Sequence, residues 1–402
     1  MIKTLYTTIL ACILTISVSA QTAYITNFTS NAVAVIDLST NTVTNSIAVG
    51  TNPWGVATSF DGNRVYIGNY GNNTVSVIST ATNTVTNTIN VGNNPNGIAC
   101  SPNGSNVYVA NEGANTVSVI NTFSNTVSAT IPVVASPQGI IVSPNGSKVY
   151  VASWTAGTIS IINSSTNTVT ATISAGGDQD GITISPDGSK IYVTNSLSNT
   201  ITVIDSTTNT ISATIPVGVR PEGVAISPNG STLYVTNYTG NTVSVINTAT
   251  NNVTANIPVS NGPNGISVNP EGSFVYVANQ DANLITVIDA TTNTITDSIA
   301  CGNTPIAFGN FISSYSSLTG ISSQHQGAEN SSIYPNPTNG EFTISQATYD
   351  AEITITNTIG QQILNAQTND KTLHVQLNKN GVYLIQIKTK QGLQTQKLIV
   401  TR

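Results

Sequence analysis

The sequence of 402 residues has few charged side chains and almost no histidine. Asp, Glu, Lys and Arg make up 7% of the residues, and the only histidines, His325 and His374, lie near the C-terminal end. Histidine is the most frequent acid–base residue and a common metal ligand. We therefore expect no metal, haem or other cofactor in the long segment before them.

Basic residues are also scarce, and they are unevenly distributed. Residues 21–312 carry 12 acidic and 4 basic residues, whereas the chain from 313 onward carries 5 acidic and 6 basic residues. A segment with excess negative charge repels phosphate, and its glycines recur as turn residues instead of forming a phosphate-binding loop. We expect no nucleic-acid partner, and the change in charge indicates a second domain.

Long apolar runs are absent after the N-terminus. Residues 1–20 carry one basic residue, Lys3, and an apolar run that ends in small residues, which predicts a signal peptide and a mature chain that begins at Gln21. The alternative is a lipoprotein signal with lipidation at Cys12. No later segment is long enough to span a membrane.

Only Cys100 and Cys301 remain after such cleavage. Extracellular cysteines often form disulfides, but the repeats described below place these two on blades that are not neighbours. We expect two buried, unpaired thiols.

The residues that are present favour β-structure. Thr, Asn, Ser, Val, Ile and Gly fill long stretches, and all of them are poor helix formers. A tyrosine recurs every 42 residues in strands such as VYVAN, IYVTN and LYVTN. The seven positions are Tyr24, Tyr66, Tyr108, Tyr150, Tyr192, Tyr234 and Tyr276.

The rest of the repeat predicts four antiparallel strands. A Pro-x-Gly strand ends in a Ser-Pro-Asn-Gly or Ser-Pro-Asp-Gly turn, and the Tyr strand, an alternating strand and a TNTV-like strand follow. Seven four-stranded units of about 40 residues predict a seven-bladed β-propeller, the all-β fold that we expect for residues 21–312. A parallel β-helix is the alternative, but its coils are shorter and lack these hairpins.

The ring requires a closing strand, because blade one starts at its Tyr strand. Residues 305–310 fall in the register of the missing Pro-x-Gly strand, with Ala307 at the glycine position. We expect this segment to complete blade one and to remove an exposed edge.

The repeats resemble the YVTN family of β-propellers. This resemblance implies an exported, surface-layer-like protein, but it does not imply a particular activity.

The C-terminal part differs from the repeats. Residues 313–332 are rich in Ser and Gly and predict a linker. Residues 333–402 alternate over 341–345, 353–357, 373–377 and 382–388, which predicts a small β-sandwich. An ordinary adhesion sandwich is one interpretation of this pattern.

Four motifs support a second interpretation of this tail. It resembles the C-terminal sorting domain of the type IX (Por) secretion system through Tyr334-Pro335-Asn336-Pro337 with Gly340, Ile353-Thr354-Ile355 with Gly360-Gln361, Gly381-Val382-Tyr383 and Lys397-Leu398-Ile399-Val400. The resemblance implies that residues 333–402 contact the secretion machinery and that the protein is secreted or displayed on the cell surface.

Candidate ligand-binding residues follow from strand direction. Adjacent strands are antiparallel, so the loop before each Pro-x-Gly strand and the loop after each Tyr strand emerge on one face. The candidate positions are Trp54, Asn96, Gln138, Asp180, Glu222, Asn264 and Ile306 in the first set, and Phe28, Tyr70, Glu112, Trp154, Ser196, Tyr238 and Gln280 in the second.

A charged group also falls on this face. Asp178, Asp180, Arg220 and Glu222 occupy matching positions on blades five and six, so they should lie close together. We favour a solvated ion pair over a catalytic or cation-binding group.

Two functions follow from this pattern. We expect a monomeric, non-enzymatic module that binds a glycan, a peptide or a surface protein. A lactonase-like hydrolase or lyase that uses these carboxylates is the alternative.

Overall fold

The computed structural model describes residues 21–313, 332–334, 338–345, 351–357, 362–368, 370–379, 381–389 and 392–400. The predicted signal peptide lies outside these residues, as do most of the linker and parts of the sorting motifs, including Pro335-Asn336-Pro337 and Gly360-Gln361. Among the described residues, no helix is long and apolar enough to cross a membrane. The chain divides into two compact units, Met1–Leu318 and Thr319–Arg402.

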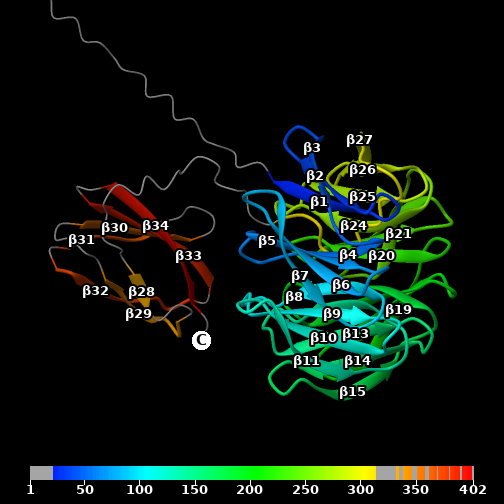
Figure 1. The fold of residues 1–402 in the computed structure, drawn as a ribbon, viewed down its shortest axis with the longest axis horizontal. Helices are drawn as coiled ribbons and strands as arrows, with labels where there is room; N and C mark the ends of the chain where they lie inside the picture. Colours follow the sequence, from blue (N-terminus) through cyan, green and yellow to red (C-terminus); the bar gives the residue numbers. More distant parts are fainter. Residues whose placement is uncertain are drawn as a thin grey trace, which may run out of the picture. The chain divides into compact units, whose positions relative to one another are not determined.

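The first unit is a seven-bladed β-propeller, and its strands follow one another around the ring from blue to yellow in Figure 1. The innermost strands are β4 (Pro53–Thr58), β8 (Pro95–Cys100), β12 (Pro137–Val142), β16 (Gln179–Ile184), β20 (Pro221–Ile226) and β24 (Pro263–Val268). The second strands are β1 (Thr22–Asn27), β5 (Arg64–Asn69), β9 (Asn106–Asn111), β13 (Lys148–Ser153), β17 (Lys190–Asn195), β21 (Thr232–Asn237) and β25 (Phe274–Asn279).

The outer half of each blade is equally regular. The third strands are β2 (Ala32–Asp37), β6 (Thr74–Ser79), β10 (Thr116–Asn121), β14 (Thr158–Asn163), β18 (Thr200–Asp205), β22 (Thr242–Asn247) and β26 (Leu284–Asp289). The fourth strands are β3 (Thr42–Ala48), β7 (Thr84–Asn90), β11 (Thr126–Pro132), β15 (Thr168–Ser174), β19 (Thr210–Pro216), β23 (Asn252–Pro258) and β27 (Thr294–Ala300). Neighbouring strands pair antiparallel, as the repeat predicts.

The core lies between blades. The repeated tyrosines are at most 2% exposed, and one apolar cluster joins Tyr66 and Val75 of blade two to Ile98 and Val107 of blade three. Burial of this apolar area from both sides stabilises each interface between neighbouring blades. A single blade has two apolar faces, so it requires both neighbours.

The turn between the first and second strands has the structure that its Ser-Pro-x-Gly sequence predicts. In blade three, the Gly104 N–H donates to the Ser101 carbonyl over 2.9 Å, and Gly104 has a φ of +71°. The Ser101 hydroxyl also accepts the Asn106 N–H over 2.9 Å. The left-handed φ explains the glycine at this position.

The predicted closing segment lies beside β1, but it makes only isolated bridges to it, so the sheet of blade one has three strands, and its register differs from the prediction. Asn27 pairs with Pro305 as expected, but Ala23 pairs with Ile312 and not with Asn310, which would be its partner in a regular blade. Ala307 explains the difference. A Cβ on Gly55, the matching residue of blade two, would lie 1.9 Å from the Asn96 carbonyl oxygen, so an alanine does not fit the regular path.

The closing segment therefore bulges by two residues and bonds to two blades. Ala307 adopts a φ of 50°. The Ile306 N–H donates to Thr26 of β1 over 2.9 Å, while the Phe308 and Asn310 carbonyls accept the N–H groups of Val56 and Thr58 on β4 over 3.0 and 3.1 Å. The bulge thus brings Phe308 and Asn310 of the closing segment to β4, the innermost strand of blade two.

Both cysteines of the propeller are unpaired. Cys301 is buried as expected, and burial raises the pKa of its thiol to about 12. Cys100 is partly exposed, so the expectation that both thiols are buried is wrong for this residue. It lies on the innermost strand β8, which borders the centre of the ring.

The second unit is a sandwich of two sheets around a common apolar core. One sheet has the order β28 (Ser332–Tyr334), β29 (Glu341–Ser345) and β32 (Thr372–Gln376). The other has the order β31 (Gln362–Thr368), β30 (Ala351–Asn357), β33 (Gly381–Thr389) and β34 (Gly392–Val400). Strands β28, β31 and β34 were not predicted, because they are short or contain runs of polar residues that hide the alternation.

Candidate functional site

The two predicted loops of each blade lie side by side on one face. In all seven blades the N–H of the residue after the Tyr strand donates to the carbonyl of the residue before the innermost strand, over 2.7 to 3.0 Å. Tyr238 and Arg220 are one such pair, at 2.8 Å. Residues before the innermost strand adopt left-handed conformations, for example Arg220 with a φ of 57°. This geometry turns both loops toward the same face.

Side chains of the two sets also meet within blades. Asn96 donates to Glu112 over 3.1 Å, and Asn264 donates to Gln280 over 3.1 Å. The Ser196 hydroxyl donates to the Asp180 carboxylate. We call the residues of both sets the upper rim. Gln138 and Trp154 hold the same positions on blade four, but no hydrogen bond or ring contact joins them in the described part of the chain.

Aromatic side chains gather on blades one and two. The Phe28 and Trp54 rings are 5.5 Å apart at 87°, and the Trp54 and Tyr70 rings are 5.8 Å apart. Edge-to-face pairs of this kind stabilise beyond the area that they bury. Trp154 stands apart from this cluster and is 37% exposed.

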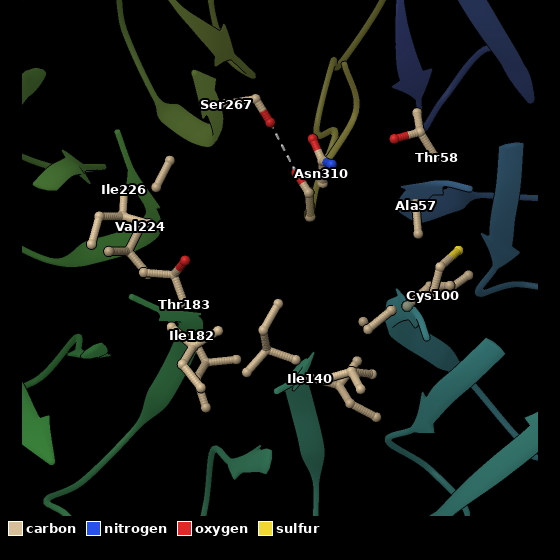
Figure 2. A pocket seen from close by; sticks show the side chains of 18 of the residues that line it. Ala57, Thr58, Cys100, Ile140, Ile182, Thr183, Val224, Ile226, Ser267 and Asn310 are labelled. Atoms are coloured by element: carbon tan, nitrogen blue, oxygen red, sulfur yellow. Dashed lines mark hydrogen bonds between the residues drawn. The ribbon is translucent and has the colours of Figure 1, made fainter. Parts of the chain in front are cut away.

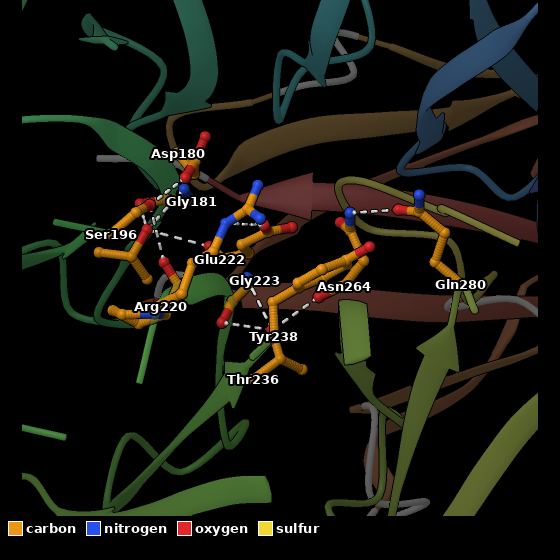
Figure 3. Close-up of polar contacts among 12 residues, drawn as sticks. Asp180, Gly181, Ser196, Arg220, Glu222, Gly223, Thr236, Tyr238, Asn264 and Gln280 are labelled. Atoms are coloured by element: carbon orange, nitrogen blue, oxygen red, sulfur yellow. Dashed lines mark hydrogen bonds and ion pairs between the residues drawn. The ribbon is translucent and has the colours of Figure 1, made fainter. Parts of the chain in front are cut away.

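The charged group on blades five and six comes together as expected. The Arg220 Nε lies 3.0 Å from a Glu222 carboxylate oxygen, and its guanidinium lies 4.6 Å from the centre of the Tyr238 ring (Figure 3). The expected solvated ion pair is wrong for one partner, because the Glu222 side chain is 9% exposed while that of Arg220 is 53% exposed. The acid occupies the second position of an innermost strand, and neighbouring blades cover it.

Burial changes how the two acids hold their protons. Burial first, and then the charge of Asp180, raises the pKa of Glu222 to about 8, although Arg220 lowers it. Burial also raises the pKa of Asp180 to about 6, against the hydrogen bond from Ser196 and the charge of Arg220. At neutral pH, acids with pKa values near neutrality can gain or lose a proton, whereas isolated carboxyls are already ionised.

One rim residue was missed by the sequence analysis. The Tyr238 hydroxyl donates to Asp281 over 3.0 and 3.1 Å, so this carboxylate extends the polar side of the rim to blade seven. Asp281 lies in the loop after a Tyr strand, one residue beyond the position that was chosen. Its acidic side chain in an otherwise neutral loop was the available signal.

Ile306 also departs from expectation, because it is fully buried. It belongs to the closing segment, which packs into the core of blade one. No group of three or more His, Cys, Asp or Glu residues in the described chain is arranged to hold a metal ion.

Comparison with known proteins addresses both units. Residues 332–401 match the model of the secretion system C-terminal sorting domain. Residues 182–300 match the seven-bladed β-propeller lactonase model, and residues 55–220 match the choice-of-anchor I domain model. The chain is a β-propeller protein with a type IX sorting tail. This tail indicates export to the cell surface or the extracellular space through the type IX secretion machinery.

Solved structures support the propeller fold. A hydrazine synthase chain of Kuenenia stuttgartiensis is 24% identical, with a TM-score of 0.62 over 66% of this chain and 91% of its own. A Bacteroides uniformis protein described as a 6-phosphogluconolactonase is 19% identical, with a TM-score of 0.62 over 72% of this chain and 98% of its own. At these identities the likeness shows the fold alone. The comparison with curated proteins found no match.

Proposed function

We propose that the upper rim is the binding site of a non-enzymatic extracellular module, and that its ligand is a glycan. The observation that carries the proposal is the pairing of the two loop sets into one rim with aromatic rings on blades one, two, four and six. Its partly exposed Glu112 and Gln280 are held from beneath by the buried amides of Asn96 and Asn264. Exposed faces of Trp and Tyr stack on apolar sugar faces, while amides and carboxylates bind hydroxyl groups. A peptide or a surface protein is the other ligand class for this site.

The exposed Trp154 provides the sharpest test of this site. Trp154→Ala should weaken binding to a glycan found on an array by about tenfold, with little change in the melting temperature, because this ring contacts no other aromatic ring among the described residues. Trp54→Ala should weaken binding and also lower the melting temperature, because Trp54 packs against Phe28 and Tyr70.

Phe123→Ala is the matched control for this test. Phe123 is an aromatic residue that is 94% exposed in the turn between β10 and β11, at the opposite end of the blades. Its loss should leave glycan binding unchanged. If Trp154→Ala and Phe123→Ala bind alike, the upper rim is not the binding site.

A second function has one specific observation in its favour. The half-buried Asp180 and the buried Glu222 have pKa values of about 6 and about 8, and values close to neutrality are typical of catalytic acids and bases. The match to the lactonase model over residues 182–300 includes Glu222. This alternative is a lactone hydrolase in which Glu222 transfers the proton.

Hydrolysis of a sugar lactone by the full chain distinguishes the two functions. If Glu222 transfers a proton, Glu222→Gln should lower kcat by at least about a hundredfold. Asp187→Asn, at the turn end of blade five, should have no effect on this reaction. Equal slow hydrolysis by the native chain and Glu222→Gln would eliminate the enzymatic function and leave the binding module.

A further inference from the structure

A cavity of about 690 Å³ lies at the centre of the propeller, below the upper rim. Its wall runs from the glycines of the Pro-x-Gly strands, such as Gly97 and Gly139, to the prolines of the following turns, such as Pro102 and Pro144. None of the upper-rim residues lines it. Because its lining includes the turn prolines and none of the rim residues, the cavity extends toward the turns and not to the rim.

The wall of this cavity is aliphatic and uncharged. Its most regular feature is one branched side chain from each of five successive blades: Ile98, Ile140, Ile182, Val224 and Ile266. No Asp, Glu, Lys, Arg or His lines the cavity. A volume of this size with a mainly apolar wall matches the typical small-molecule site of proteins.

The opposite side of the cavity carries hydrogen-bonding groups, because the closing segment bulges there (Figure 2). The Thr58 hydroxyl donates to the Ile312 carbonyl over 3.1 Å, and the Ser267 hydroxyl donates to the Gly309 carbonyl over 3.4 Å, so both have partners. Asn310 is exposed, and its side-chain amide makes no hydrogen bond within the described chain. One free donor and acceptor thus faces an aliphatic wall.

Charges of both signs lie near the opening, because Asp61 and Asp187 occupy turns and Arg64 and Lys190 follow them by three residues. Asp187 follows Pro186, a lining residue, and hydrogen bonds from Ser185 and Ser189 lower the pKa of its carboxyl. Asp61 occupies the same turn position on blade two. No charged side chain lines the cavity, so an uncompensated charge on a ligand inside it would be unfavourable.

We propose that this cavity binds one aliphatic molecule with an uncharged hydrogen-bonding head group, such as an alcohol. The chain lies against the isoleucine wall, and the head group bonds to the Asn310 amide. The site is independent of the upper rim, so its ligand and the proposed glycan bind at opposite ends of the blades.

Titration calorimetry of the full chain with decan-1-ol tests this site. Decan-1-ol should bind once per chain, and sodium decanoate should bind at least about tenfold more weakly. Ala225→Trp places an indole at a small, partly exposed wall position and should abolish binding. Ala249→Trp, at an exposed turn outside the cavity, is the matched control and should bind as the native chain does.

Asn310→Ala distinguishes binding at this site from nonspecific partitioning of the alcohol into apolar regions. It also gives a test that does not depend on whether Ala225→Trp folds. It should weaken decan-1-ol binding about threefold to tenfold, as expected for one lost hydrogen bond. Trp154→Ala should leave decan-1-ol binding unchanged, whatever its effect on glycans. The proposal is overturned if decan-1-ol does not bind, if decanoate binds as well, or if Ala225→Trp and Asn310→Ala both bind like the native chain.

Discussion

Deletion of residues 303–312 should abolish cooperative unfolding of the propeller and cause aggregation. These residues cover the inner edge of β1 through isolated bridges and also bond to β4 of blade two. Without them, β1 has an unpaired edge, and the cluster around Ile25 and Val33 is open to water. An exposed strand edge readily pairs with a second molecule. Size-exclusion chromatography and chemical unfolding followed by circular dichroism would measure both effects.

A single substitution provides a graded version of this prediction. Phe311 is fully buried in the core cluster of blade one, so Phe311→Ala should lower the free energy of unfolding by about 3–5 kcal/mol. Phe123→Ala removes a ring that is 94% exposed and should change stability by less than about 0.5 kcal/mol. If the deletion and Phe311→Ala both unfold as the native chain does, the ring closes by other contacts.

Stability of the propeller should fall as pH rises from about 5 to about 9. Glu222 has a pKa of about 8 in the folded chain, above its ordinary value of 4.5, so the folded state holds a proton that the unfolded state has released. Such a difference makes folding less favourable with each step in pH between those two values. Full ionisation should cost on the order of 3–5 kcal/mol. Asp180, with a pKa of about 6, adds a loss at lower pH.

Glu222→Gln isolates this effect. The variant should match the native chain at about pH 3, where the carboxyl is protonated in both states, and should be more stable at pH 9. Asp187→Asn is the control, because hydrogen bonds lower the pKa of Asp187 and its ionised form is already favoured at neutral pH. Unfolding curves at several pH values would show the difference. A native chain as stable at pH 9 as at pH 5 would contradict the burial of an ionisable Glu222.

The regular part of the fold was predictable because each repeat contains the motifs that define its own strands and turns. The tyrosine step, the Pro-x-Gly strand and the Ser-Pro-x-Gly turn each define a strand or a reversal by local chemistry. The closing bulge was not predictable, since it depends on whether a Cβ at Ala307 fits against the neighbouring blade. Such a fit depends on residues that are far apart in the sequence, so local patterns do not reveal it.

The candidate site was predictable in position but not in environment. Strand direction alone brought Asp180, Glu222, Trp54 and Tyr70 to one face. Sequence spacing does not report how closely neighbouring blades cover a side chain, so Glu222 was expected in solvent and is instead buried. The central cavity escaped prediction for the same reason, because its wall is assembled from four or five residues of every blade.

The closing segment also sets an order of events for the nascent chain. Blade one contains the first strand of the repeats and the last segment before residue 313, so no polypeptide that stops short of this segment can form a closed ring. All twenty-six propeller strands that follow β1 are synthesised before the segment that covers the inner edge of β1. The tail that directs export begins about twenty residues further along the chain. Any chain that ends before the closing segment therefore leaves the inner edge of β1 unpaired.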